Sequence, residues 1–373
     1  MSNQAHASLA AWLLGAPVKC TLSREESLRM HAKRHPIELE YRAGCDADGH
    51  LTGLFVRGIG ASGAYASVGM KVLERAAGHA CGPYRWQAID IETIAVRTNN
   101  LVCGAFRGFG ANQAQFAMEG VIDRLAQAVG ISGWEMRKRN VIKPGDEWGP
   151  GQLMDDGAGG AEACLDEIRG AYESAIDDGK AVGLGLGLKN SGLGNGFREV
   201  SKAVVQFLPP ADGSGTPGRI EVRHGWTEMG QGVHTVALQV AAQELGVDPA
   251  RIDVIVDTTR ELGFGQTTGS RGTLMAAGSV SEACASAVAG GCEIGVDYEG
   301  EYVVDWTQKL GDPGVTNPTI HSCFSYAAQM VVADPASGDI ERVVAVHDVG
   351  RAVNPMLVEG QVEGSVHMGL GYA

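Results

Sequence analysis

The 373-residue sequence lacks three features that would assign it to common classes of protein. It has no run of about 18 apolar residues, which a membrane-spanning helix requires, and no secretion signal at its N-terminus. Its formal net charge is −14, whereas proteins that bind nucleic acid or anionic membranes carry a basic surface. None of its eight cysteines forms a Cys-x-x-Cys pair, so we expect no zinc site or iron–sulfur cluster held by this chain alone. These absences predict a cytoplasmic protein with reduced thiols and with neither nucleic acid nor membrane as partner.

Glycine is the residue type in clear excess. The chain contains 54 glycines, about twice the ordinary share, and they follow no collagen-like period. Hydrophobic residues make up 44% and charged residues 20%, which is typical of a globular protein. We therefore expect many tight turns, or places where backbone comes close to a bulky group.

The order of helical and extended patterns predicts an α+β fold, because the two types alternate without a strict βαβ rhythm. The polar, glycine-rich segment 147–160 is typical of a domain junction. We expect a first domain at 1–150, a linker with a helix at 151–180 and a second domain at 181–373. Predicted strands lie at 37–57 (two strands), 88–96, 182–196, 202–207, 219–223, 252–257, 324–332 and 340–348. Predicted helices lie at 112–129, 134–140, 162–175, 233–245, 273–289 and 358–370.

Three short glycine-rich stretches precede predicted helices: GAFRGFG (104–110), EMGQG (228–232) and QTTGSRGT (266–273). Backbone N–H groups at the start of a helix bind anions, and glycine lets the backbone approach a ligand closely. The three stretches therefore either converge on one large anionic ligand or form three unrelated structural turns.

The identity and order of these motifs carry a resemblance to a known family. AFRGFG, then TEMGQG, then DVGRAVNPMLVEGQVEG (348–364) resemble the molybdopterin-binding subunits of the xanthine dehydrogenase and aldehyde oxidase family. The resemblance covers nearly the whole chain and is weakest at 147–180. Its supporting motifs are AAWLLGAPVKCTLSREES (10–27), KRHP (33–36) and RKRNVIKPGD (137–146). It implies a two-domain molybdopterin-binding region with mixed sheets and packed helices.

The resemblance also implies a reaction class. Members of this family hydroxylate an electron-poor carbon, often in a purine, with oxygen derived from water and with a glutamate as base. A molybdenum centre held by a pterin accepts the electrons, which leave through iron–sulfur clusters to FAD on partner domains or subunits. We therefore expect a small heteroaromatic substrate and a dimer of heteromers. Whether the pterin carries a nucleotide, as a dinucleotide, stays open.

Two residues match the family's substrate-binding positions. Phe109 matches an aromatic residue that stacks on the substrate ring, and the alternative is a core phenylalanine beside a glycine turn. Arg75 matches an arginine that hydrogen-bonds a purine carbonyl, and the alternative is a surface arginine on a helix. Aldehyde-oxidising relatives tend to lack this arginine, so it favours a purine-like substrate.

Further residues match the family's cofactor-binding positions. The backbones of Arg107 and Gly269 match positions that approach the molybdenum centre. Gln231 matches a glutamine that hydrogen-bonds the pterin. Arg271 could add a cation to the phosphate, although many relatives differ there. The loop around the cofactor and its phosphate matches Gly269, Ser270, Gly272 and Thr273.

The sequence departs from the family at both ends. The family has a GGFGGK-type loop before the stretch that starts here at Met1, and a GE-P segment with the glutamate base after the stretch that ends at Ala373. Met368 stands where relatives often carry a glutamine. We therefore expect a fragment without its own catalytic base. The alternatives to a purine hydroxylase are an oxidoreductase for aldehydes or other N-heterocycles, and a catalytically inactive cofactor-binding fragment.

Overall fold

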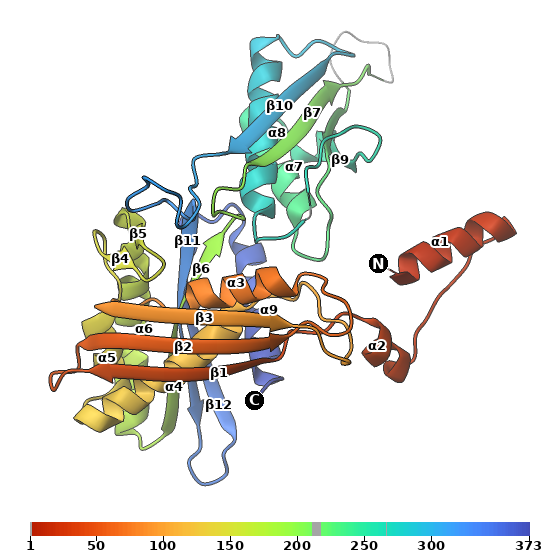
Figure 1. The fold of residues 1–373 in the computed structure, drawn as a ribbon. Helices are drawn as coiled ribbons and strands as arrows, with labels where there is room; N and C mark the ends of the chain where they lie inside the picture. Colours follow the sequence, from red (N-terminus) through yellow and green to blue (C-terminus); the bar gives the residue numbers. More distant parts are fainter. Residues whose placement is uncertain (1, 211–217, 266) are drawn as a thin grey trace. The chain divides into compact units, whose positions relative to one another are not determined.

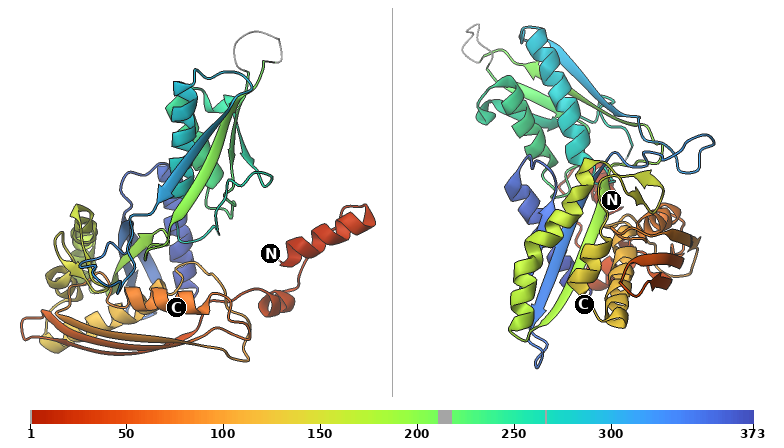
Figure 2. Two further views of the ribbon diagram at one scale, coloured as in Figure 1. Left: turned by 45° about the horizontal axis from the view of Figure 1, so that its top comes forward. Right: turned by 90° about the vertical axis from the view of Figure 1, so that its left-hand side faces the viewer.

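The computed structural model in Figures 1 and 2 describes residues 2–210, 218–265 and 267–373. The chain forms two compact units. Unit 1 contains residues 1–41, 56–80 and 90–114, and unit 2 contains residues 42–55, 81–89 and 115–373. Helices and strands are mixed and most strand pairs are antiparallel, which confirms the predicted α+β class. No helix in the described ranges is long and apolar enough to cross a membrane.

The helices are α1 (Ser2–Leu14), α2 (Arg24–Met30), α3 (Gly69–His79), α4 (Ala111–Val129), α5 (Gly133–Asn140), α6 (Gly159–Asp177), α7 (Val233–Leu245), α8 (Gly272–Ala289) and α9 (Pro355–Leu370). The strands are β1 (Ile37–Cys45), β2 (Leu51–Ala61), β3 (Ala88–Val96), β4 (Glu147–Trp148), β5 (Gln152–Leu153), β6 (Ala181–Ser191), β7 (Glu199–Phe207), β8 (Ile220–His224), β9 (Ile252–Val256), β10 (Asp297–Val304), β11 (Cys323–Ala333) and β12 (Ile340–Asp348). They form sheets in the orders β1-β2-β3, β10-β7-β8-β9, β12-β11-β6 and β4-β5.

In unit 1, helix α3 lies against strands β2 and β3. A Cβ atom at Gly60 of β2 would lie only 2.5 Å from a methyl carbon of Leu73, so glycine makes room for this buried leucine. The hydroxyl of Thr93 on β3 donates to the carbonyl of Leu73 at 3.0 Å. The apolar face of α3, which includes Val72, Leu73 and Ala76, is therefore fixed on the sheet.

In unit 2, α7 and α8 cover one face of the mixed sheet β10-β7-β8-β9 (Figure 1). The packing is close because small residues line the contact. A Cβ atom at Gly300 of β10 would lie 2.1 Å from the backbone nitrogen of Ala283 on α8. The core between helices and sheet contains Val205, Val222, Ala237, Ala241, Val280, Ala283 and Ala287. Strand β10 was not among the predicted strands.

The sheet β12-β11-β6 packs against α6, and side chains of α4 bond to its outer strand β6. The amide of Gln115 bonds to both the N–H and the carbonyl of Leu188, with N···O distances of 3.1 and 2.6 Å. One helical turn later, the Glu119 carboxylate accepts from the N–H of Leu186 at 2.8 Å. These two side chains satisfy backbone groups that an edge strand would otherwise leave open.

A buried arginine fixes α5 to α4. The side chain of Arg137 is fully buried, and its guanidinium donates to Glu119 and Asp123 at 2.8 Å each. Glu119 also accepts from the Tyr84 hydroxyl at 2.6 Å. Burial alone would lower the pKa of Arg137, but Glu119, Tyr84 and Asp123 outweigh it and raise that pKa. The RKRN motif thus contributes an internal ion pair.

We expect Arg137→Met to lower the free energy of unfolding by about 3–5 kcal/mol, because it leaves the Glu119 carboxylate buried without its cation. The matched control is Arg139→Met on the same helix, whose ion pair with Glu135 is partly exposed. It should cost less than about 1 kcal/mol. Urea unfolding of the three proteins measures both values, and equal losses would refute the role given to Arg137.

Candidate functional site

The glycine-rich turn at 104–110 belongs to unit 1 and ends where α4 begins. Three consecutive residues in it adopt left-handed backbone conformations: Gly108 at φ +93°, Phe109 at φ +53° and Gly110 at φ +96°. A bulky aromatic residue rarely adopts this conformation, because it is strained. Such strain is often found at functional sites, so Phe109 stays a candidate for ligand contact.

This turn lies beside the part of α3 that carries Arg75. A Cβ atom at Gly110 would lie 2.2 Å from the carbonyl oxygen of Val72 and 3.0 Å from the backbone nitrogen of Ala76. The Arg75 side chain is half-buried. The backbone carbonyl of Arg75 accepts a hydrogen bond from Nδ1 of the His79 ring at 3.0 Å. Unit 1 therefore brings together the segments that carry the two predicted substrate-binding residues, Arg75 and Phe109.

In unit 2, the turn before α7 contains a carboxylate side chain that binds the backbone of the same turn. The Glu228 carboxylate accepts from the backbone N–H groups of Gly230 at 2.7 Å, Gly232 at 2.9 Å and His234 at 3.4 Å. Burial would raise the pKa of Glu228, but these three donors outweigh it and the pKa is lowered. The N–H groups of Gly230, Gly232 and His234 are thus bonded to Glu228, which favours the structural alternative over binding of an external anion at these three groups.

Gln231 lies within the same turn. Its side-chain NH₂ donates to the carbonyl of Thr227 at 2.8 Å, and its side-chain oxygen accepts from the N–H of Met229 at 2.5 Å. A side-chain amide has two donor hydrogens and two acceptor lone pairs, and these bonds use one of each. Gln231 can therefore form further hydrogen bonds to a ligand. Its bonding to the pterin stays a prediction.

The turn before α8 carries four of the predicted residues and contacts the end of β6. Gly269 (φ +72°) and Ser270 (φ +49°) are both left-handed. The carbonyl of Gly269 accepts from the N–H of Gly192 at 2.8 Å, and the carbonyl of Ser270 accepts from the Ser191 hydroxyl at 2.7 Å. With both carbonyls bonded to the β6 end, the peptide orientation of this turn is fixed.

Arg271 does not have the role that we considered for it. Its side chain is almost fully buried and donates to the equally buried Glu199 at 2.9 Å. It also donates to the carbonyl of Phe264 at 3.2 Å, and its guanidinium carbon lies 5.2 Å from the centroid of the Trp226 ring. Arg271 therefore anchors the start of α8 from inside, and a phosphate contact by its side chain is not supported.

The beginning of α8 fits an anionic group better than the beginning of α7 does. Among the described residues, no side chain caps this end of α8. The N–H groups of Gly272 and Thr273 lack partners inside the helix, and the helix dipole favours negative charge there. Ser270 and Thr273 are exposed and add hydroxyl groups. This donor set suits a phosphate.

The two turns of unit 2 are directly joined. The backbone N–H of Thr227 donates to the hydroxyl of Thr267 at 3.2 Å. Helix α9 contributes as well, since a Cβ atom at Gly232 would lie 2.7 Å from Leu357, and the Asn354 amide donates to Gln239 at 2.9 Å. Unit 2 thus gathers Gln231 and the group Gly269, Ser270, Gly272 and Thr273, whereas Arg107, Arg75 and Phe109 belong to unit 1.

A buried histidine supports the bend that precedes the turn before α7. His224 is fully buried, and its Nδ1 accepts from the N–H of Trp226 at 3.0 Å. Burial, and to a smaller extent the neighbouring His234, lowers the pKa of His224 to about 4, although Glu228 acts in the opposite direction. His224 is therefore neutral at pH 7 and serves as a hydrogen-bond acceptor within this bend.

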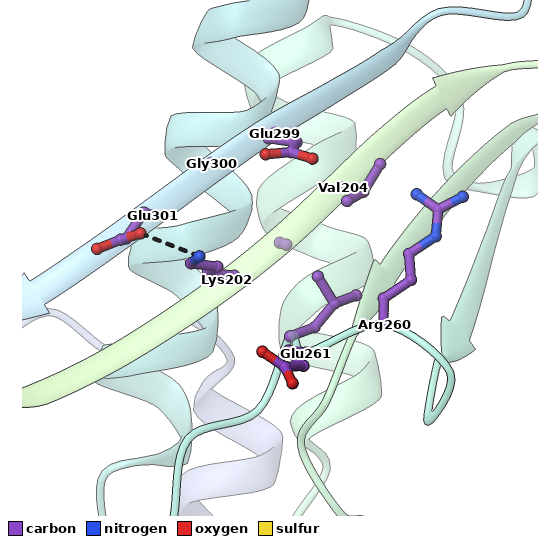
Figure 3. A pocket seen from close by; sticks show the side chains of 9 residues that line it. Lys202, Val204, Arg260, Glu261, Glu299, Gly300 and Glu301 are labelled. Carbon is purple, nitrogen blue, oxygen red and sulfur yellow. Dashed lines mark ion pairs between the residues drawn. The ribbon is translucent and has the colours of Figure 1, made fainter.

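A separate cavity in unit 2 contains none of the predicted residues. It has a volume of about 490 Å³ and lies on the sheet face turned away from α8 (Figure 3). Lys202 pairs there with Glu301 at 3.5 Å, and Glu261 and Glu299 add two more carboxylates. Arg260 also lines the cavity, so two cations stand beside three carboxylates, and this balance offers no preference for an anionic cofactor.

Sequence reasoning missed two residues that contact the predicted turns. Glu228 lies inside TEMGQG, and Arg34, which donates to the carbonyl of Arg107, lies inside KRHP. Both stand in motifs that carried the resemblance. The role of Glu228 could have been predicted from the sequence, because an acidic residue stands just before a glycine turn that leads into a helix. No local sequence pattern predicts the contact made by Arg34.

Known proteins resemble this chain over nearly its whole length. Residues 1–141, and residues 160–296 and 287–373, match a family described as "Molybdopterin cofactor-binding domain". The chain is 30% identical to a probable xanthine dehydrogenase subunit of Bacillus subtilis, over 100% of this chain and 55% of the relative. It is 36% identical to the "Nicotinate dehydrogenase large molybdopterin subunit" of Eubacterium barkeri, over 48% of this chain and 41% of the relative. The chain thus spans about half the length of the curated relatives it matches.

Solved structures share the fold. The aldehyde oxidoreductase from Desulfovibrio desulfuricans matches 99% of this chain and 43% of its own, with a TM-score of 0.84 at 24% identity. The quinoline 2-oxidoreductase from Pseudomonas putida matches 95% of this chain and 52% of its own, with a TM-score of 0.70 at 25% identity.

The role of Glu228 predicts a stability difference that depends on pH. A carboxyl whose pKa is lowered by folding stabilises the folded state above its unfolded pKa, near 4.3, and loses that effect as pH falls through the folded pKa. We expect Glu228→Gln to lower the free energy of unfolding by about 1–2 kcal/mol at pH 7 and by clearly less near pH 3.

Thermal unfolding of both proteins across this pH range measures the difference. The matched control is Glu282→Gln, an exposed glutamate on α8. It should leave the transition unchanged at every pH. A loss for Glu228→Gln that does not vary with pH would contradict the bonding described.

Proposed function

The chain belongs to the family of molybdopterin cofactor-binding domains, and on that premise we propose that it is part of a molybdenum hydroxylase acting on a purine-like N-heterocycle. The oxygen added to the substrate derives from water. Electrons pass to iron–sulfur and FAD groups on partner domains or subunits. The observation that carries this proposal is the pairing of a strained Phe109 with the adjacent turn of α3 that bears Arg75.

The two residues suit a planar, electron-poor ring. The aromatic face of Phe109 would stack on such a ring, and its side chain is only partly buried, on a left-handed turn. The Arg75 guanidinium is always charged and donates to a ring carbonyl on which negative charge develops. An aldehyde has no comparable carbonyl beside the reacting carbon, so Arg75 favours a purine-like substrate.

The glycine turns hold the cofactor in this proposal. When bound, the molybdenum-pterin cofactor supplies the centre that accepts electrons from the substrate. Gln231 would bond to the pterin through the amide hydrogen and lone pair that its own turn leaves open, and the backbones of Arg107 and Gly269 would approach the molybdenum centre. Ser270, Gly272 and Thr273 bind the phosphate at the start of α8.

Partners follow from the same proposal. The sequence has no Cys-x-x-Cys pair, which is consistent with iron–sulfur clusters on other domains or chains, and the family resemblance adds FAD there. Several relatives are named as subunits, including the "Nicotine 6-hydroxylase large subunit" of Paenarthrobacter nicotinovorans. We propose a complex of such subunits, assembled as a dimer of heteromers in the cytoplasm.

A second candidate keeps the cofactor and changes the substrate. The 36% identity to a nicotinate dehydrogenase subunit favours another N-heterocycle, and the fold is shared with aldehyde oxidoreductases. A chain that binds cofactor without turnover is the remaining alternative. These alternatives differ in which compounds the assembled complex oxidises.

The test is a substrate panel on the complex purified with its partner subunits. We expect stoichiometric molybdenum by elemental analysis and faster turnover of hypoxanthine or xanthine than of nicotinate or simple aldehydes. Arg75→Met should lower purine turnover by about 100-fold, because one charged donor is lost, and aldehyde turnover by less than about threefold.

Lys71→Met is the matched control, since Lys71 lies on the same helix and pairs with Glu74 at the surface. It should leave both activities unchanged. Equal losses of purine and aldehyde turnover in Arg75→Met would contradict the substrate assignment, and a complex without molybdenum would contradict the enzyme proposal.

A further inference from the structure

The segment that contains KRHP runs alongside the glycine turn of unit 1. The N–H of Lys33 donates to the carbonyl of Val102, and the N–H of Gly104 donates to the carbonyl of Lys33, both at 3.0 Å. Two residues later, the carbonyl of His35 accepts from the Gln113 amide at 3.1 Å. The segment is thus bonded to both ends of the turn, and Arg34 stands between these attachments.

The Arg34 side chain contacts both the turn and the first residues of α4. Its Nη1 donates to the carbonyl of Arg107 at 2.7 Å and to the side-chain oxygen of Asn112 at 3.1 Å. Its guanidinium carbon lies 4.5 Å from the centroid of the Phe106 ring, in a cation–π contact. A Cβ atom at Gly108 would lie 2.4 Å from the same Asn112 oxygen, so glycine leaves the space in which this oxygen meets Arg34.

One of these contacts fixes a peptide group. A trans peptide is planar, and its carbonyl and N–H point in opposite directions. The described residues contain no cis peptide bond. When Arg34 binds the Arg107 carbonyl, the N–H of Gly108 must therefore point away from Arg34. The orientation of this donor is set by a side chain 73 positions earlier in the sequence.

We propose that Arg34 is a positioning residue that aims the Arg107–Gly108 peptide at the cofactor. The inference rests on the proposed function, in which the Arg107 backbone lines the metal end of the cofactor. Arg34 itself does not touch the cofactor or the substrate. It acts through the peptide, because its Nη1 donates in the guanidinium plane to a carbonyl and an amide oxygen while the face of that plane lies over an aromatic ring.

A lysine cannot replace this arginine. Its ammonium is a compact charge on a flexible stem and offers no planar face to Phe106. Arg34→Lys therefore keeps the positive charge and removes the stacking and the fixed fork. If charge alone matters, lysine should restore the wild-type behaviour. If peptide orientation matters, lysine should behave like alanine.

The test uses the complete complex with its cofactor and partner subunits, in wild-type, Arg34→Ala and Arg34→Lys forms. Molybdenum content is measured first. The electron paramagnetic resonance spectrum of molybdenum(V) is then recorded after reduction with dithionite, which needs no substrate. Steady-state kcat and KM are measured with the best substrate of the panel.

The matched control is Arg169→Ala on α6. Its guanidinium carbon lies 4.6 Å from the centroid of the Trp134 ring, and it pairs with Glu173 at the surface. The substitution therefore removes a cation–π contact of the same kind in a segment without predicted site residues. It should leave the spectrum, molybdenum content and kcat unchanged.

We expect both Arg34 variants to keep molybdenum within about twofold of wild type, because the other turns still bind the cofactor. The molybdenum(V) spectrum should shift and kcat should fall by about 10–100-fold, with a smaller change in KM. If the complex with Arg34→Ala does not assemble, the result for Arg34→Lys alone tests the inference. A wild-type spectrum and kcat in Arg34→Lys would overturn the inference, whereas absence of molybdenum from the wild-type complex would overturn the proposed function instead.

Discussion

Backbone in the left-handed conformation, just before the start of a helix, is the constraint on which the site depends. Gly108, Gly230 and Gly269 all have positive φ in turns that lead into α4, α7 and α8. This conformation is open to glycine and costs other residues about 1–2 kcal/mol each. It lets a turn bring its peptide groups to the surface without a side chain in the way. The excess of glycine in this sequence therefore has a structural cause at these turns.

Charged side chains of the chain itself stabilise the turns. Arg34 binds the carbonyl side of the turn at 104–110, Glu228 binds the N–H groups before α7, and Arg271 with Glu199 anchors the start of α8. Each charge is matched by internal partners, so the groups left for a ligand are mostly neutral peptides, hydroxyls and one amide. Such a surface suits a large polar heterocycle, and only the start of α8 suits a fully charged group.

The sequence predicted most of the fold because hydrophobic periodicity is a local property. The predictions of strand 88–96 and helix 233–245 are confirmed to the residue, and those of helices 112–129 and 273–289 nearly so. Strand β10 was missed because Asp297, Glu299 and Glu301 alternate along it, and acidic residues are uncommon in strands. Their side chains can face solvent because the opposite face of this strand packs on α8.

The candidate site was harder to predict from the sequence, because contacts between residues far apart in the chain determine its geometry. The motif spacing correctly located the three turns, but it could not show that Glu228 fills the start of α7 or that Arg271 points inward to Glu199, 72 positions away. It also gave no role to Arg34, whose partners lie 73 and 78 positions along the chain. The roles of Gln231 and Gly269 toward a pterin, and of Arg75 and Phe109 toward a substrate, stay predictions.

An experimental structure of the assembled complex with its cofactor is the most direct measurement. We expect the Arg107–Gly108 peptide, the Gln231 amide and the Gly269–Thr273 turn all to lie within about 3.5 Å of a single molybdenum-bearing pterin. If the pterin contacts the residues of only one unit, or if these three groups line different surfaces of the complex, the proposal that the glycine turns bind one cofactor together is wrong.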